Sequence, residues 1–163
     1  MKAFRVVADS SCLIGLAQIK KFEILKELFL EIFVPEAVYN EVVVDGKGEP
    51  GSEEMEIAIK EGWISRIKVK DEVAVKALTS ILGKGEAEVI ILSKELDVDY
   101  ALIDEGTARG QAGLMDVSVI GVLGILDLAF EKGHQIDKKK LVDQLKGLGF
   151  RISDSLYRQM FPD

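Results

Sequence analysis

Two apolar runs in this sequence end in acidic side chains. Residues 3–8 (AFRVVA) lead directly into Asp9. Residues 100–103 (YALI) lead into Asp104 and Glu105. Short apolar, β-branched runs of this kind predict buried strands. In an open parallel sheet, ligands bind beyond the carboxyl ends of the strands, so the three acids are predicted to meet at one edge.

These acids also have a structural interpretation. A carboxylate just before a helix accepts hydrogen bonds from the first free backbone N–H groups. Asp9 precedes a helical pattern over residues 10–17, and Asp104 and Glu105 precede the segment 106–113. The sequence therefore leaves two readings open for each acid, a helix cap and a member of a site.

Further acids lie on apolar helical patterns. Glu41 comes three residues after Val38, which predicts a position at the margin of the buried face of its helix. Glu86 opens a helix over residues 86–96, where a carboxylate also complements the helix dipole. Glu88 belongs to the same helix, and apolar residues surround that helix almost completely. Periodicity therefore does not separate Glu88 from Glu86.

A group of acids without histidine or cysteine favours a hard cation. Carboxylate oxygens suit Mg²⁺ or Mn²⁺ better than zinc, and Mg²⁺ is the predicted ion. Such an ion suits hydrolysis of a phosphodiester by an activated water. The one histidine, His134, lies in a helix-ending turn, and the one cysteine, Cys12, is predicted to be a small core residue.

Several other classes are excluded. The sequence has no phosphate-binding GxxxxGK[ST] loop, no GxSxG elbow and no HExxH motif. A single cysteine rules out a disulfide framework and a cysteine-based zinc finger. With 21 Lys+Arg against 28 Asp+Glu, the net charge of −7 argues against a protein that coats duplex DNA through a cationic face.

The elements that must position the acids alternate along the chain. Strands are predicted at 3–8, 32–34, 63–69, 100–103 and 117–120, and helices at 22–29, after Pro35, and at 52–61, 86–96, 121–130, 138–146 and 153–160. This alternation is typical of a parallel sheet covered by helices on both faces, so the predicted fold class is α/β. We expect one domain over residues 1–163, with 137–163 as a helical C-terminal arm.

No membrane segment is predicted. The longest apolar stretch, residues 117–130, is too short to span a bilayer and contains Asp127. The N-terminal apolar run is interrupted by Asp9 before a signal-like segment is complete. A cytoplasmic protein is therefore expected.

Taken in order, the motifs of this sequence resemble a PIN domain. The resemblance rests on residues 9–11 (DSS), 34–42 (VPEAVYNEV), 85–90 (GEAEVI), 102–105 (LIDE) and 119–121 (VIG). With the ending 149–153 (GFRIS), the chain is similar to the prokaryotic DUF3368 branch, relatives of the VapC toxins. The resemblance covers almost the whole chain.

The resemblance implies a three-layer α/β/α fold with a central parallel sheet and a Mg²⁺-dependent endoribonuclease site. The implied catalytic acids are Asp9, Glu41, Glu86, Asp104 and Glu105, all but Glu41 as metal ligands, with Ser10 beside the first of them. Counting back from residues 119–121 favours Glu105 for the last acid, whereas Asp104 is nearer the strand end. Both are kept.

Two biological readings follow from the resemblance. The first is a ribonuclease that acts as the toxin of a toxin–antitoxin pair, with RNA as substrate and an antitoxin protein as partner. The alternative is a PIN-like interaction or nucleic-acid-binding module that has kept the fold without turnover. Metal-dependent RNA cleavage that Asp9→Asn abolishes distinguishes the two.

Binding of RNA beside a carboxylate pocket requires basic residues outside it. Arg109 lies four residues after Glu105, so it is predicted at the rim of the pocket, within reach of a bound phosphate. Lys84 and the run 138–140 are further candidates, although three adjacent lysines also suit the start of a solvated helix.

A homodimer is also expected. Leu123, Leu126 and the arm over residues 138–160 offer more apolar side chains than the edge of one small domain is expected to hide.

Overall fold

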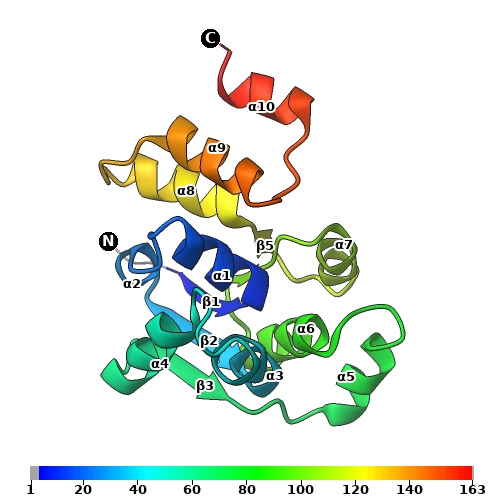
Figure 1. Ribbon diagram of the computed structural model, residues 1–163. Helices are drawn as coiled ribbons and strands as arrows, with labels where there is room; N and C mark the ends of the chain where they lie inside the picture. Colours follow the sequence, from blue (N-terminus) through cyan, green and yellow to red (C-terminus); the bar gives the residue numbers. More distant parts are fainter. Residues whose placement is uncertain (1–3, 163) are drawn as a thin grey trace.

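The computed structural model describes residues 4–162, and the strands among them form one parallel sheet (Figure 1). The five strands lie in the order β3-β2-β1-β4-β5. Their bounds are β1 Arg5–Ala8, β2 Glu31–Pro35, β3 Ile64–Ile67, β4 Tyr100–Leu102 and β5 Val119–Ile120. Every neighbouring pair runs parallel. The predicted α/β class is confirmed.

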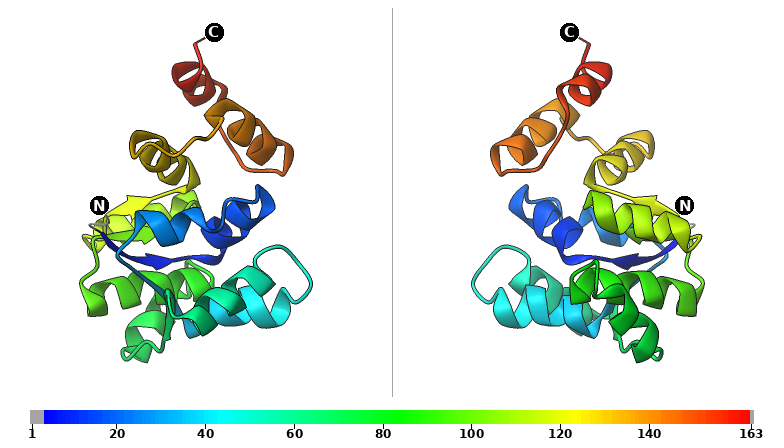
Figure 2. Two further views of the ribbon diagram at one scale, coloured as in Figure 1. Left: turned by 90° about the vertical axis from the view of Figure 1, so that its left-hand side faces the viewer. Right: turned by 90° about the vertical axis from the view of Figure 1, so that its right-hand side faces the viewer.

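Helices connect the strands throughout. They are α1 Ser10–Gln18, α2 Ile24–Leu28, α3 Glu36–Tyr39, the π-helix η1 Asn40–Asp45, α4 Ser52–Glu61, α5 Glu72–Leu78, α6 Lys84–Leu96, α7 Gly106–Leu114, α8 Val122–Glu131, α9 Lys138–Gly147 and α10 Asp154–Met160. α1 packs with α8 on one side of the sheet, and α6 packs against β1, β2 and β4 on the other (Figure 2). The result is the expected three-layer α/β/α arrangement.

β1 lies at the centre of the sheet and is buried on both faces. Val6, Val7 and Ala8 are fully inaccessible, as expected for a parallel strand covered by helices on both sides. After β1 the chain builds β2 and β3 on one side and then returns to add β4 on the other. The switch point therefore lies between β1 and β4, where ligands bind in folds of this kind.

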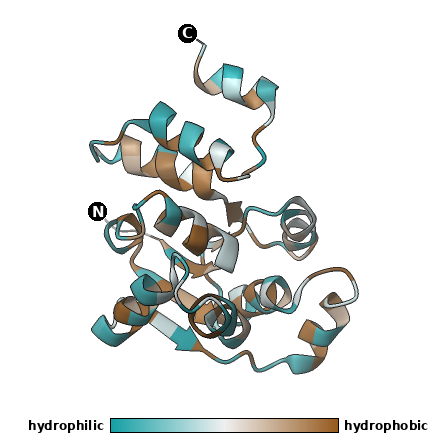
Figure 3. Ribbon diagram, in the orientation of Figure 1, coloured by the Kyte–Doolittle hydropathy of each residue, from teal (hydrophilic) through white to brown (hydrophobic). Residues whose placement is uncertain are grey.

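The C-terminal arm is only partly separate from the body. In α9, Leu141, Val142 and Leu145 are buried, and this helix contacts α8 (Figure 1). The colouring by hydropathy shows apolar residues on both α8 and α9, whereas α10 has no buried residue (Figure 3). Leu126 is fully buried within this chain, so its use in a dimer surface was wrongly predicted. The homodimer itself stays a prediction.

The boundaries of several elements differ from the sequence-based expectations. The strand predicted over 63–69 is shorter, and α5 was not expected at all. α5 begins after Asp71, whose side chain accepts a hydrogen bond from Ala74 N. The predicted start of the first strand, at residue 3, lies outside the described residues. In the described part of the chain, no helix is long and apolar enough to cross a membrane.

Candidate active site

Asp9 is the buried centre of the candidate site. It follows β1 directly and is 2 % exposed. Its backbone N–H donates to Leu102 O at 3.0 Å, which joins the ends of β1 and β4. Its Oδ1 accepts from Ser10 N at 2.8 Å and caps α1. Asp9 thus has the structural role of a cap and also lies at the switch point.

Ser10 links Asp9 to Glu41. The Ser10 hydroxyl donates to Glu41 Oε2 at 3.1 Å and also lies 3.5 Å from Asp9 Oδ1. The hydroxyl of Ser10 therefore lies between the carboxylates of Asp9 and Glu41, which are 32 positions apart in the sequence. This small side chain therefore positions the acid of a distant helix against Asp9.

Glu41 is exposed, not at the margin of a buried face as the periodicity predicted. The reason is that residues 40–45 form the π-helix η1, whose wider turn breaks the 3.6-residue period. The carboxylate of Glu41 lies over Gly85, where a methyl group would collide with Glu41 Oε1. The glycine at the start of α6 thus leaves the space that Glu41 occupies.

Glu86 lies in the first turn of α6. Its Oε1 accepts from Gly83 N at 3.1 Å, so it helps to cap this helix, close to the helix N-terminus where the sequence predicted a favourable interaction with the dipole. Partial burial raises its pKa, and the nearby charges of Glu105 and Glu41 raise it further. Glu86 is therefore both a cap and a member of a group of repelling acids.

Glu105 caps α7 with both oxygens. Oε1 accepts from Thr107 N at 3.0 Å, and Oε2 accepts from Ala108 N at 2.7 Å. These backbone hydrogen bonds hold its pKa below the ordinary value. Its carboxyl group also shares a hydrogen bond with Glu86, which raises the pKa of Glu86. Of the two acids after β4, Glu105 is the one that contacts the others.

Asp104 points to a different set of partners. Its Oδ2 accepts from Cys12 Sγ at 3.1 Å, and its Oδ1 accepts from Val122 N at 3.0 Å, at the start of α8. Cys12 is fully buried, and burial followed by the charge of Asp104 raises its pKa well above the ordinary value. Cys12 is thus the expected core residue, and Asp104 ties it to α8.

The carboxylates crowd closely enough to alter protonation. The pKa of Asp9 is raised from 3.8 to about 7, first by burial and then by the charges of Glu86 and Glu41, against the lowering effect of Ser10 N. No ion pair within residues 4–162 involves Asp9, Glu41, Glu86 or Glu105. Repulsion among these acids therefore adds to the effect of burial on the pKa of Asp9.

The donors at this site suit a hard divalent cation. They are carboxylate and hydroxyl oxygens, the type that Mg²⁺ and Mn²⁺ prefer. Among residues 4–162, no three His, Cys, Asp or Glu side chains are already arranged as a metal-binding group. A cation would remove the repulsion that adds to burial in raising the pKa values of Asp9 and Glu86. Asp9, Glu86 and Glu105 are the candidate ligands for such an ion.

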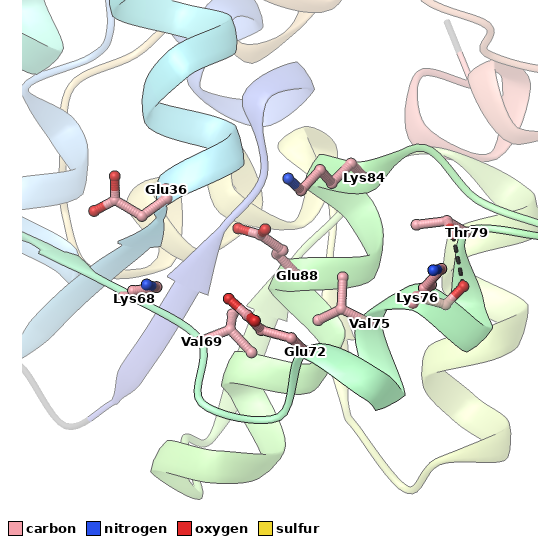
Figure 4. A pocket seen from close by; sticks show the side chains of 9 residues that line it. All are labelled: Glu36, Lys68, Val69, Glu72, Val75, Lys76, Thr79, Lys84 and Glu88. Atoms are coloured by element: carbon pink, nitrogen blue, oxygen red, sulfur yellow. Dashed lines mark hydrogen bonds between the residues drawn. The ribbon is translucent and has the colours of Figure 1, made fainter.

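Glu88 and Lys84 face away from this group. Glu88 is buried, and its Oε1 accepts from Ala37 N at 3.0 Å, which supports the start of α3. Both residues line a cavity of about 480 Å³ that Lys68, Lys76 and Glu72 also line (Figure 4). The structure thus distinguishes Glu88, which supports α3, from Glu86. Sequence periodicity could not distinguish them.

The remaining basic candidates divide into two groups. Arg109 lines a cavity of about 390 Å³ together with Asp104 and Gly121, so it lies beside the first of the two acids that follow β4. Lys138 instead donates to Asp127 at 2.8 Å, and Lys139 lies 3.4 Å from Asp143. Lys138 therefore links α9 to α8, and Lys139 makes a contact within α9.

One residue near the acids was missed. Arg151 lines a cavity of about 800 Å³ with Ser11, Glu105 and Thr107. The only signal for it in the sequence is the ending 149–153, which carried a family resemblance but no role.

Comparisons with known proteins agree with this architecture. The sequence model of the protein family DUF3368, which is described as a PIN domain, matches residues 5–162 of this chain. The fold is similar to that of a PilT N-terminus domain protein from the hyperthermophilic archaeon Sulfolobus solfataricus P2, with a TM-score of 0.52 and 14% identity over 80% of this chain and 95% of that chain. At that identity the likeness shows the fold alone. No curated protein matches the chain.

Proposed function

The chain belongs to the PIN domain family, and on that premise we propose that it is a Mg²⁺-dependent endoribonuclease that cleaves RNA phosphodiester bonds. One observation carries the proposal. Asp9, Glu41 and Glu86 gather at the switch point of a parallel sheet, with the pKa of Asp9 raised to about 7 and no ion pair to any of the three within residues 4–162. Carboxylates that repel one another and have no positively charged partner are typical of a site that binds a cation.

The roles of the residues follow from their contacts. Asp9, Glu86 and Glu105 would hold the ion, which when bound supplies charge neutralisation at the phosphate and a more acidic water. Glu41 is exposed and oriented by the Ser10 hydroxyl, so it is the carboxylate in place to accept a proton from the attacking water. Ser10 is a positioning residue in this scheme.

The test compares Asp9→Asn with Asp137→Asn on a fluorescently labelled single-stranded RNA. Both aspartates cap helices, α1 and α9, and asparagine preserves the capping bond, but only Asp9 lies at the proposed site. Cleavage should require Mg²⁺ or Mn²⁺ and stop with EDTA. Asp9→Asn should lower the rate by about 10²-fold or more, and Asp137→Asn should leave it unchanged.

Cleavage that persists in EDTA or in Asp9→Asn contradicts the proposal. The alternative of an interaction module draws on a specific observation, namely that Asp9, Glu86 and Glu105 all cap helices and so have a structural reason to be present. Folded wild-type protein without cleavage in either metal supports that alternative.

A toxin role is an extension of this proposal. Induced expression of the wild-type chain should arrest cell growth, and Asp9→Asn should remove the arrest. Growth arrest by both variants alike rules out RNA cleavage as its cause.

A further inference from the structure

The connection between α9 and α10 forms a wall beside the candidate active site. The cavity of about 390 Å³ and the cavity of about 800 Å³ share Asp104, Phe150 and Arg151 among their lining residues. One extends toward Arg109 and the other toward Glu105. The first of these cavities is also lined by Val119 and Ile120 of β5. The segment 150–151 therefore lies between two halves of one groove.

This segment is anchored at two points. The ring of Phe150 lies against Gly15 in α1, where a methyl group would come within 2.5 Å of its Cζ atom. The backbone N–H of Phe150 donates to Leu145 O at 3.0 Å. Gly149, with φ of +99°, makes the left-handed turn that directs the chain off α9. The neighbour of Phe150, Arg151, is therefore held at the groove.

The arginines of the groove differ from the two that lie on the strands of the sheet. Arg5 pairs with Glu31, and Arg66 pairs with Glu36. Arg109 and Arg151 are exposed, and within residues 4–162 neither has an ion pair or a hydrogen bond through its guanidinium group. In a chain of net charge −7, two such groups beside acids are available for an anionic ligand.

We propose that Arg151, held in the groove by Phe150, acts with Arg109 to bind the backbone phosphates of a single-stranded RNA that enters the acid site. This inference rests on the proposed function, because it names how the substrate of that site is held. The carboxylates repel phosphate, so the strand needs cationic groups just outside them. Guanidinium groups grip phosphates in bidentate fashion, and two of them in adjoining cavities suit a polyanion.

The test measures binding of a fluorescently labelled single-stranded RNA in EDTA, by anisotropy at several salt concentrations. Arg151→Ala and Arg109→Ala should each weaken binding about tenfold and flatten the slope of log affinity against log salt by about 0.7. Arg158→Ala is the matched control, because Arg158 is also exposed, lies on α10 and does not line the groove. It should change neither quantity.

A second variant tests the anchor without removing charge. Phe150→Leu should weaken binding by less than Arg151→Ala, since the guanidinium remains but its segment is less constrained. Thermal melting of each variant checks that the protein is folded. Phe150→Leu with binding equal to the wild type removes the anchoring role from the inference.

The outcomes separate this inference from the proposed function. If wild-type protein cleaves RNA and Arg151→Ala behaves like Arg158→Ala, the inference is overturned and the nuclease function stands. If Arg151→Ala weakens RNA binding but the wild type never cleaves with Mg²⁺ or Mn²⁺, the binding groove stands and the nuclease function fails. Absence of any RNA binding by the wild type overturns the inference.

Discussion

Two neighbouring strands, β1 and β2, lead into carboxylates with opposite environments. Glu36 follows β2, and Arg66 on β3 binds it through two hydrogen bonds, Nε to Oε1 at 2.8 Å and Nη2 to Oε2 at 2.6 Å. These bonds hold the pKa of Glu36 below its ordinary value. Asp9 follows β1, and its burial, followed by the charges of Glu86 and Glu41, raises its pKa to about 7. The same sheet edge thus carries a compensated acid and an uncompensated one.

The difference shows where the fold supplies its own countercharge. Arg66 also stacks on Tyr39, with its guanidinium carbon 3.7 Å from the ring centre, so the pair with Glu36 is complete without a ligand. Asp9 is almost completely buried, and its neighbours add negative charge. An unfavourable charge group that persists in a native fold is typical of a functional site.

The largest expected effect is on the pH dependence of stability in EDTA. The folded pKa of Asp9, about 7, lies above the ordinary 3.8, so the folded chain keeps a proton that the unfolded chain releases. Stability should therefore fall as pH rises from about 4 to about 7, by about 4 kcal/mol in all, and then level off. Urea unfolding should show the wild type about 2 kcal/mol less stable at pH 8 than at pH 5.5.

Asp9→Asn should remove most of this dependence, and Glu36→Gln should keep it, because the pKa of Asp9 is raised whereas that of Glu36 is lowered. A wild-type pH profile that coincides with that of Asp9→Asn contradicts the assignment.

A smaller effect is expected from adding the metal. At pH 8, Mg²⁺ at a hundredfold excess over its Kd should stabilise the wild type by about 2.7 kcal/mol, because binding to the folded state alone shifts the unfolding equilibrium. Thermal melting with increasing Mg²⁺ or Mn²⁺ measures this. Glu36→Gln should respond like the wild type, whereas equal stabilisation of Asp9→Asn would place the ion elsewhere.

Gly85→Ala tests the role of Glu41 among the acids that have no positively charged partner in the part of the chain that the structure describes. The new methyl group collides with Glu41 Oε1, and the exposed Glu41 side chain should move away at little cost in stability. RNA cleavage should fall about tenfold, equivalent to about 1.4 kcal/mol. Gly113→Ala in α7, which meets nothing within 4 Å, is the control and should keep full activity. Unchanged cleavage by Gly85→Ala removes Glu41 from the mechanism.

The smallest effect is expected at the compensated acid. Arg66 and Glu36 have side chains that are 39% and 35% exposed, so solvent screens their attraction. Arg66→Ala should lower the free energy of unfolding by about 1 kcal/mol or less and leave RNA cleavage unchanged. Urea midpoints measure the first quantity. A loss of several kcal/mol would mean that this pair supports more of the fold than its exposure indicates.

The sequence by itself determined the alternation of strands and helices and the acids at strand ends. Residues 6–8 are apolar because β1 is buried on both faces, and residues 52–61 form a helix that begins and ends where Ser52 and Gly62 predict. Local patterns of this kind are readable because burial imposes a period on each element. The parallel topology then placed Asp9 beside the end of β4.

Only the tertiary structure decided how the side chains around that edge are used. Glu105 turns toward Glu86, whereas its neighbour Asp104 turns toward Cys12. Glu41 is exposed because a π-helix interrupts the expected period, and Arg151 reaches the groove from the far end of the chain. These contacts depend on packing between segments that are distant in the sequence. The hydrophobic periodicity of one segment therefore does not show which of two adjacent side chains makes such a contact.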